Sequence, residues 1–245
     1  MWYNDFTKQK EGFFMKKTLI MVLALVLVLC FGASSALAAG KLETKQENFH
    51  FVTSYWNYGY AFAKVENVGD KAIDVNAGVL ELYDEAGDVL NSTDWISDYA
   101  KTLQPGEYTY VQMYCEVEEE GVVATDYMLT VTGKSDNEAS TLRLPCETDL
   151  ELGVTDGWWE YNYMYAVVTN NTDEPVYDIS VVMALLDAEG NIIYMADDFM
   201  YNERALMPGS SMIIRKDIES GFMEYFEANS ITPASVDAIA YVNED

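Results

Sequence analysis

The chain has 245 residues, 50% of them hydrophobic and 13% aromatic, and carries a formal net charge of -27. Such a composition supplies enough apolar side chains for a folded core, so wholesale disorder is excluded. The strong negative charge repels nucleic acid and anionic membrane surfaces, so the sequence predicts no nucleic-acid partner.

The first 38 residues have the pattern of a secretory signal peptide. Lys16 and Lys17 provide a charged start, residues 19–32 form an uncharged and mostly aliphatic run, and Ala36-Leu37-Ala38 is a small-x-small cleavage site. We therefore expect an exported bacterial protein, located outside the cell or in the cell envelope. After cleavage no membrane-inserted segment is expected.

Two details of this N-terminal segment stay open. Residues 1–14 are polar and aromatic, unlike a signal peptide, so translation is expected to begin at Met15 and the mature chain at Ala39. The aliphatic run is short for a spanning helix, although with the small residues that follow it would make a marginal retained anchor. Cys30 also permits a lipoprotein interpretation, which the bulky residue before it disfavours.

The rest of the chain contains an internal duplication. LELYDEAGDVL at residues 80–90 returns as MALLDAEGNII at residues 183–193, and the spacing of 103 residues also relates Asn67 to Asn170. A Pro-Gly pair recurs at the same spacing. We expect two small all-β domains.

The duplication sets the predicted domain boundaries. Residues 39–48 are polar and without periodicity, which favours a mobile tether. The first β-sandwich domain is expected over residues 49–147 and the second over residues 148–245. Residues 135–147 between them are expected to form a short hinge with limited freedom.

Each copy is predicted to alternate strands with tight turns. In copy one the predicted strands are residues 58–66, 73–83, 89–95, 108–117 and 126–132. Pro105-Gly106 fits a type II turn, and Asp84 and Gly87 fit a hairpin, since the carboxylate accepts turn amides and glycine tolerates positive φ. Copy two repeats this order but has a connection at 221–235 that is eight residues longer, with a short helical turn expected near 221–229. Insertions in surface loops often carry function.

The succession of a strand ending in asparagine, the LELYDEAG stretch and a Leu-x-Pro-Gly turn resembles the FxLYD family of bacterial extracytoplasmic domains. The resemblance covers residues 49–242 and implies an immunoglobulin-like β-sandwich for each copy. The family's Phe is Leu80 in copy one and Met183 in copy two, while its Tyr is Tyr83 in copy one and Leu186 in copy two. The resemblance implies a fold and a compartment, and it brings no catalytic residues or cofactor.

The sequence offers few residues for catalysis. His50 is the single histidine, so His-based triads and metal sites lack their usual groups. No Gly-rich phosphate loop follows a strand and opens a helix. Neither an enzyme activity, a cofactor nor a metal site is predicted.

The cysteines and the acidic hairpins each leave two interpretations. Cys115 and Cys146 remain after signal removal, and export permits a disulfide between them, although free thiols are an open alternative. The hairpin acids supply oxygen ligands of the kind calcium prefers. They are Asp84, Glu85 and Asp88 in copy one and Asp187, Glu189 and Asn191 in copy two. Turn chemistry already accounts for Asp84, so we favour solvated hairpins.

The candidate ligand-binding residues are two matched rows of aromatic side chains, one on the first long strand of each copy. They are Trp56, Tyr58, Tyr60 and Phe62, and Trp159, Tyr161, Tyr163 and Tyr165. In copy one the row shares its face with Lys64 and Glu66, so the aromatics lie outside if charge marks the solvent side. In copy two it continues into Val167 and Thr169, which gives exposure no support there. An exposed row would suit sugar rings or a partner's side chains, whereas the alternative is that the rings pair across strands or fill the core.

These features favour a non-catalytic interaction protein whose partner is another protein or an envelope glycan. The alternative is a carbohydrate-binding module that uses the aromatic rows. Glycan binding that is lost on Trp56→Ala or Trp159→Ala would distinguish the second from the first. An enzyme ranks third because site residues are missing.

Overall fold

The computed structural model describes residues 40–53, 57–97, 99–119, 121–135, 140–200 and 205–244. The predicted signal peptide, its start at Met15, its cleavage site, Cys30 and Trp56 lie outside the described residues. Over the described residues the chain is mostly antiparallel β-sheet with one helix, α2 (Ser220–Asn229), in agreement with the predicted all-β class.

Copy one consists of two sheets packed face to face. Its inner sheet, in spatial order, contains β1 (Leu42–Thr53), β2 (Asn57–Asn67) and β6 (Tyr108–Glu116). Its outer sheet contains β4 (Val89–Thr93), β3 (Ile73–Tyr83), β5 (Thr102–Leu103) and β7 (Asp126–Lys134).

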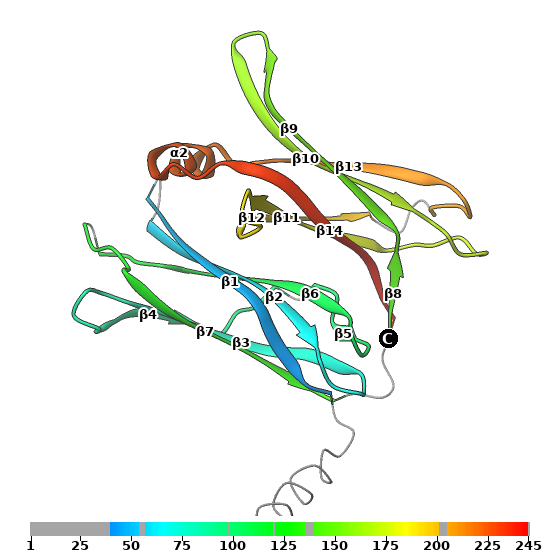
Figure 1. The fold of residues 1–245 in the computed structure, drawn as a ribbon, viewed down its shortest axis with the longest axis horizontal. Coiled ribbons are helices and arrows are strands. Elements are labelled where there is room, and N and C mark those ends of the chain that lie inside the picture. Colours follow the sequence, from blue (N-terminus) through cyan, green and yellow to red (C-terminus); the bar gives the residue numbers. More distant parts are fainter. Residues whose placement is uncertain are drawn as a thin grey trace, which may run out of the picture. The chain divides into compact units, whose positions relative to one another are not determined.

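Copy two also consists of two sheets. Its inner sheet, in spatial order, contains β12 (Ile192–Met200), β11 (Ile179–Asp187), β14 (Pro233–Glu244) and β8 (Ser140–Leu144). Its outer sheet contains β13 (Ser211–Asp217), β10 (Trp159–Thr169) and β9 (Cys146–Asp156). Figure 1 shows the four sheets stacked, with the two inner sheets facing each other.

The alternation of side chains along the strands builds the core of copy one. Ala61, Ala63 and Val65 of β2 are fully buried and pack with Leu80 and Leu82 of β3. This is the core face that the parity of β2 predicted, because successive side chains of a strand point to opposite faces.

The two copies share a second core. Phe62 and Tyr110, on the opposite face of copy one's inner sheet, belong to one buried cluster with Val182 and Ala184 of β11 and Phe222 of α2. Residues 40–245 accordingly form one compact unit. The expected hinge motion between independent copies is replaced by a continuous apolar contact, since separating the copies would expose this cluster to water.

Two expected boundaries differ from the structure. Within the stretch 39–48, expected to be a tether, residues 42–48 form the first half of β1, because Leu42 packs on copy one's core and the strand pairs with β2 from Leu42↔Asn67 onward. Residues 140–147, assigned to copy one, belong to copy two, because β8 pairs with β14 and Leu144 is buried in the shared core. The described part of the link between the copies ends at residue 135 and resumes at 140.

A buried asparagine lies at the end of β2 in copy one and of β10 in copy two. The Asn170 amide donates to the Glu174 and Leu206 carbonyls at 2.8 and 2.7 Å, and its Oδ1 accepts from the Thr172 amide at 2.9 Å. Asn67 makes the same set of contacts in copy one, with the Lys71 and Leu103 carbonyls and the Gly69 amide. Both side chains are fully buried. The amide therefore substitutes for backbone partners that the turn would otherwise leave unpaired.

The turns predicted from glycine have the expected conformations. Gly106 and Gly209 adopt φ of 83° and 71°, and the Gly106 amide donates to the Asn67 carbonyl at 2.8 Å, as Gly209 does to Asn170. The hydrogen bond from the Glu107 amide to the Gln104 carbonyl fits the predicted type II turn. Each Pro-Gly turn is thus fastened to the buried asparagine of its own copy.

Replacing Asn170 by alanine is expected to lower the free energy of unfolding by about 2–4 kcal/mol, because buried carbonyls and an amide lose their partner. Urea denaturation followed by circular dichroism measures this. The exposed Asn76 is the matched control, and its alanine variant should change stability by less than about 0.5 kcal/mol. Equal effects of the two substitutions would show that the hydrogen bonds of Asn170 do not stabilise the fold.

Candidate functional site

The aromatic row of copy one faces copy two. Phe62 is fully buried, and Tyr60 stacks on it at 6.3 Å between ring centroids while meeting the edge of Phe222 of α2 at 4.9 Å. Tyr58, nearer the end of the strand, is half-buried and donates a hydrogen bond to Glu116 at 3.3 Å. The exposure predicted for copy one is therefore wrong for Phe62 and incomplete for Tyr60, and the alternative of core and cross-strand packing holds there.

The charge that suggested exposure is paired across this interface. Lys64 lies with its Nζ 3.6 Å from the Tyr108 ring centroid and 3.5 Å from Oδ2 of Asp237 on β14. The same carboxylate accepts hydrogen bonds from Tyr110 and, at 3.1 Å, from Tyr108. Burial, followed by the charge of Asp237, raises the pKa of Tyr108 to about 12. A lysine on a strand thus marks an interface here, because a partner carboxylate lies opposite.

The matched row of copy two faces away from copy one. Tyr161, Tyr163 and Tyr165 lie on the face of the outer sheet that points away from the stack, with successive ring centroids 5.7 and 6.1 Å apart. On the same face Ile213 of β13 is 71% exposed. Arg215, opposite Tyr165 in the register, holds its guanidinium 4.5 Å from the Tyr163 ring, which leaves Tyr163 only 9% exposed.

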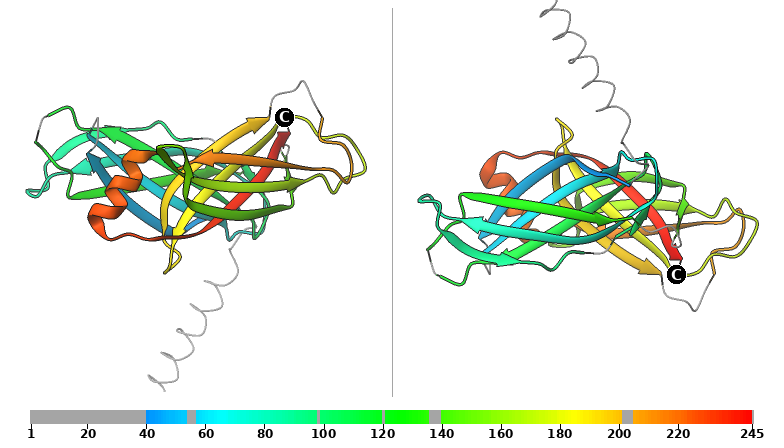
Figure 2. Two further views of the ribbon diagram at one scale, coloured as in Figure 1. Left: turned by 90° about the horizontal axis from the view of Figure 1, so that it is seen from above. Right: turned by 90° about the horizontal axis from the view of Figure 1, so that it is seen from below.

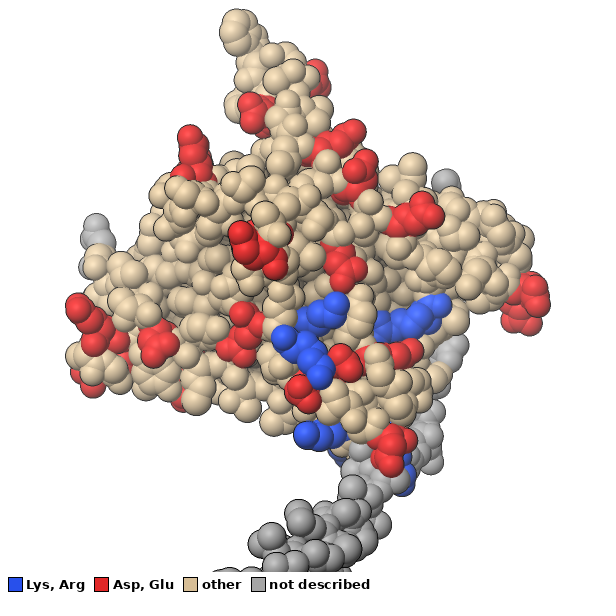
Figure 3. Space-filling view, viewed as in Figure 1, with Lys and Arg blue, Asp and Glu red and all other residues tan. Residues whose placement is uncertain are grey.

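Two tryptophans occupy the tip of the hairpin that joins β9 to β10. Trp158 is 100% exposed and Trp159 71% exposed. Gly157 supplies the positive φ of 65° that a two-residue hairpin turn starting with glycine requires. The hairpin projects beyond the stacked sheets (Figure 1), and its tip is uncharged in the space-filling view (Figure 3). Sequence reasoning missed Trp158, although an adjacent Trp pair after a glycine, between two long strands, was a usable signal.

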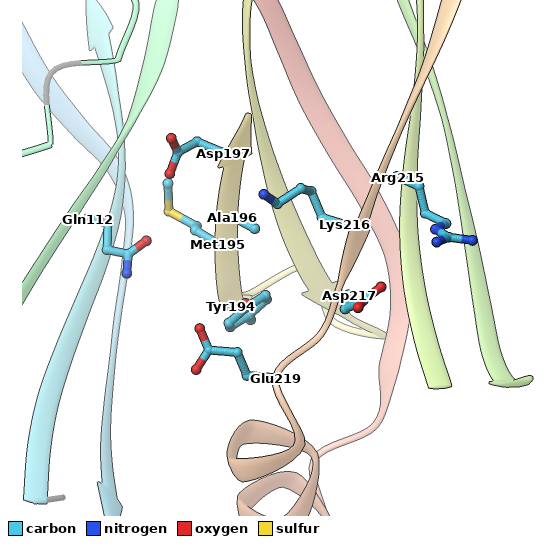
Figure 4. A pocket seen from close by; sticks show the side chains of 9 residues that line it. All are labelled: Gln112, Tyr194, Met195, Ala196, Asp197, Arg215, Lys216, Asp217 and Glu219. Carbon is cyan, nitrogen blue, oxygen red and sulfur yellow. The ribbon is translucent and has the colours of Figure 1, made fainter. Parts of the chain in front are cut away.

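Copy two lines two concave regions, one of them together with β6 of copy one. A polar pocket of about 540 Å³ between β6, β12 and β13 contains Lys216, Asp197 and Glu219 (Figure 4). In the same view Arg215 points away from this pocket, in keeping with its contact to Tyr163. A larger groove of about 1000 Å³, which we call the hairpin–helix groove, lies between the start of β10 and helix α2. Trp159 and Tyr161 line it.

The cysteines are free thiols in different parts of the molecule. Cys115 of β6 is buried in copy one's own core, whereas Cys146 of β9 packs against the shared core. The disulfide considered between them is therefore not formed. Burial raises the pKa of both thiols, that of Cys146 to about 11, so both are held in the neutral form.

The acidic hairpins use their carboxylates within the turns. Asp84 Oδ1 accepts from the Ala86 and Asp88 amides, both at 2.9 Å. Asp187 Oδ1 does the same for the Glu189 and Asn191 amides at 3.0 and 2.7 Å. The solvated-hairpin interpretation is the one that these contacts support. Within the described ranges no three His, Cys, Asp or Glu side chains group closely enough to hold a metal ion.

His50, on β1 of copy one, contacts helix α2. It is 5% exposed, with Nδ1 3.3 Å from the Tyr225 hydroxyl and Nε2 3.3 Å from the Asn48 amide nitrogen. Asn48 also donates to the Ile192 carbonyl of β12 at 2.8 Å. Figure 2 shows α2 lying beside β1, the strand that carries this histidine. Burial lowers the pKa of His50 to about 4, against a smaller opposing effect of the Asp187 charge.

Comparisons with known proteins name no family. No family model matches the chain, and no curated protein matches it. Among solved structures, the crystal structure of red sea bream transglutaminase matches 77% of this chain at 12% identity, with a TM-score of 0.21. The chain spans 28% of that protein's length, and a TM-score this low does not establish a common fold. In the part of the chain that is described, no helix has the length and apolar character to cross a membrane.

Phe62 and Tyr165 occupy equivalent positions of the two rows. The stability lost when each ring is removed therefore compares the two environments. Phe62→Ala should lower the free energy of unfolding by about 3–5 kcal/mol, because it leaves a cavity in the shared core. Tyr165→Ala should cost about 1 kcal/mol or less, since that ring is only half-buried at the surface. Guanidinium denaturation measures both values. Similar losses for the two variants would refute the contrast.

His50 should make stability fall with decreasing pH. Its folded pKa of about 4 lies below the ordinary value of 6.5, so the unfolded chain binds the proton more readily. The loss begins as the pH drops below about 6.5, continues to about 4 and reaches up to about 3 kcal/mol. The difference in unfolding free energy between the wild type and His50→Gln, measured from pH 7.5 to 4.5, should change in this window, because only the wild type loses stability as His50 binds a proton. Parallel curves would show that His50 does not titrate with folding.

Proposed function

We propose that this chain is an exported, non-catalytic binding protein of the bacterial cell envelope or extracellular space. Two immunoglobulin-like modules of the FxLYD type form its body. The proposal is supported by the antiparallel two-sheet organisation of both copies and by the recurrence of the buried asparagine with its Pro-Gly turn. The signal-peptide pattern supports export.

The binding surface that we propose is the outward face of copy two's outer sheet. The observation that carries this assignment is the different environment of the two matched rows. Phe62 lies in the shared core with Tyr60 packed on it, whereas the tyrosines of copy two's row belong to neither core cluster. Tyr161, Tyr165 and Ile213 present apolar area there, and Trp159 extends it onto the hairpin. Contiguous apolar area at a surface tends to mark a binding site.

A non-catalytic role agrees with how the reactive side chains are used. His50 is held by Asn48 and Tyr225 in a buried structural contact. Both thiols are kept neutral by burial. The histidine and both thiols are packed within the fold. The aromatic side chains on the outer sheet of copy two do not take part in the packing between the sheets.

A protein partner is favoured over a glycan. The surface rings lie in line, as a sugar platform would need, which is the observation in favour of carbohydrate binding. However, Arg215 covers the central ring and Glu151 accepts a hydrogen bond from the Tyr165 hydroxyl at 2.7 Å. The face is therefore interrupted by charged groups, as protein-binding surfaces often are at their rims.

Cosedimentation with isolated bacterial cell-envelope sacculi tests both the function and the surface. The wild type should sediment with untreated sacculi, and Tyr161→Ser/Tyr165→Ser should lose about tenfold in apparent affinity while keeping its melting temperature, because hot spots at interfaces are often tyrosines. Trp95→Ala, an exposed tryptophan on copy one, is the matched control and should bind normally.

Pretreating the sacculi distinguishes the partners. Protease should abolish binding if the partner is a protein, whereas binding that survives protease and disappears after glycan digestion would establish the carbohydrate alternative. Wild-type affinity in the double tyrosine variant would exclude the outer sheet as the binding surface.

A further inference from the structure

We propose that the hairpin–helix groove binds an extended, positively charged peptide segment of the partner protein. This inference rests on the proposed binding function and adds the chemistry of the partner. The groove adjoins the proposed surface, because Trp159 and Tyr161 belong both to the aromatic row and to the groove wall. A partner bound to the outer sheet could therefore extend directly into the groove, because the two surfaces are continuous.

The groove is built from two stretches of copy two, residues 159–162 and residues 217–233, which contribute four structural parts. They are the start of β10, the end of β13 with the link to α2, helix α2, and the residues that follow the helix. At its base the Ile218 amide donates to the Asn162 carbonyl at 2.8 Å, which ties the link to β10. Its volume of about 1000 Å³ is at the upper end of small-molecule pockets, which suits a chain segment.

The floor of the groove is apolar. Phe226 and Ile218 line it at 1% and 5% exposure, and Met223 and Ile231 lie partly buried beside them. Trp159 stands at the rim with 71% of its surface exposed. Aliphatic stems of lysine or arginine side chains, or an intervening apolar residue, can pack on such a floor while their charged ends stay at the rim.

The charged residues that line the groove are all acidic. Its five carboxylates are those of Glu160, Asp217, Glu219, Glu224 and Glu227. No lysine or arginine is among the lining residues, and the ion pairs between described residues, Lys45–Glu43, Lys64–Asp237 and Lys216–Asp198, use none of these carboxylates. Charge complementarity therefore favours a cationic occupant.

The spacing of the carboxylates favours a peptide over a metal ion. They belong to β10, β13, the link and helix α2, and no three of them lie close enough together to hold one ion. Glu224 and Glu227, three residues apart, share one side of the helix. The exposed Trp159 adds a ring face to which a lysine or arginine cation is attracted. Several separated positive charges on one chain match this arrangement.

The helix that forms the groove has no counterpart among the described residues of copy one. It lies in the connection that is eight residues longer in copy two, between β13 and β14. Its buried side, Phe222 and Phe226, packs in the shared core, while Met223, Glu224 and Glu227 line the groove. The same insertion thus covers copy one's aromatic row and creates a recess beside copy two's row.

Fluorescence anisotropy with a labelled six-residue peptide of alternating lysine and leucine tests the inference on the exported full-length protein. The peptide should bind, and a glutamate–leucine peptide of equal length should not. Glu224→Gln/Glu227→Gln should weaken binding by about tenfold or more, and Trp159→Ala by several-fold. Melting temperatures of both variants should stay close to that of the wild type, because the changed side chains lie at the surface.

Glu118→Gln/Glu119→Gln is the matched control, because it makes the same change of net charge at two exposed positions of copy one. It should alter the affinity by less than about twofold, because neither glutamate is among the residues that line the groove. Equal weakening by both double variants would overturn the site in favour of non-specific attraction. Absence of lysine–leucine binding would overturn it as well.

Cosedimentation separates this inference from the function on which it rests. If Glu224→Gln/Glu227→Gln sediments with sacculi like the wild type while Tyr161→Ser/Tyr165→Ser does not, the groove has no part in binding and the outer-sheet proposal stands. Loss of sedimentation in the groove variant, with normal behaviour of the Glu118/Glu119 control, supports the groove as part of the partner site.

Discussion

The burial of copy one's aromatic face under copy two is the contact on which the rest of the structure depends. Phe62 and Tyr110 enter one core with β11 and α2, so the inner sheets are covered on both faces. Lys64 and the tyrosine hydroxyls on this face need partners once water is removed, and Asp237 supplies them. With the inner sheets buried, surfaces for ligands are left on the two outer sheets, the strand edges and the loops.

The duplication has given two similar modules unequal roles. Each keeps its buried asparagine, its Pro-Gly turn and its aromatic row, which are requirements of the module itself. The modules differ in what lies against the row. In copy one the opposing sheet and helix α2 cover it, whereas in copy two it remains on the outer sheet. A single longer connection, the one that contains α2, accounts for much of this asymmetry.

The candidate site was predictable in its residues but not in its surroundings. Alternation along β2 and β10 correctly grouped the aromatic side chains on one face of each strand. The charge of Lys64 was a poor guide to solvent, because its partner Asp237 lies 173 positions away in the chain. The groove could not be foreseen at all, since its walls come from two segments, residues 159–162 and 217–233, that only folding brings together.

The sequence by itself determined the local structure: the strands, the hairpins with their glycines, the asparagine that closes each long strand, and the face on which each aromatic lies. These features follow from two-residue periodicity and from the φ angles that turns require, both of which act over a few residues. The tertiary structure decided the order of the sheets, the inclusion of residues 42–48 in β1, the separation of Cys115 from Cys146, and the burial of one aromatic row rather than the other. Periodicity states which side chains share a face, but what covers that face depends on contacts between residues more than a hundred positions apart.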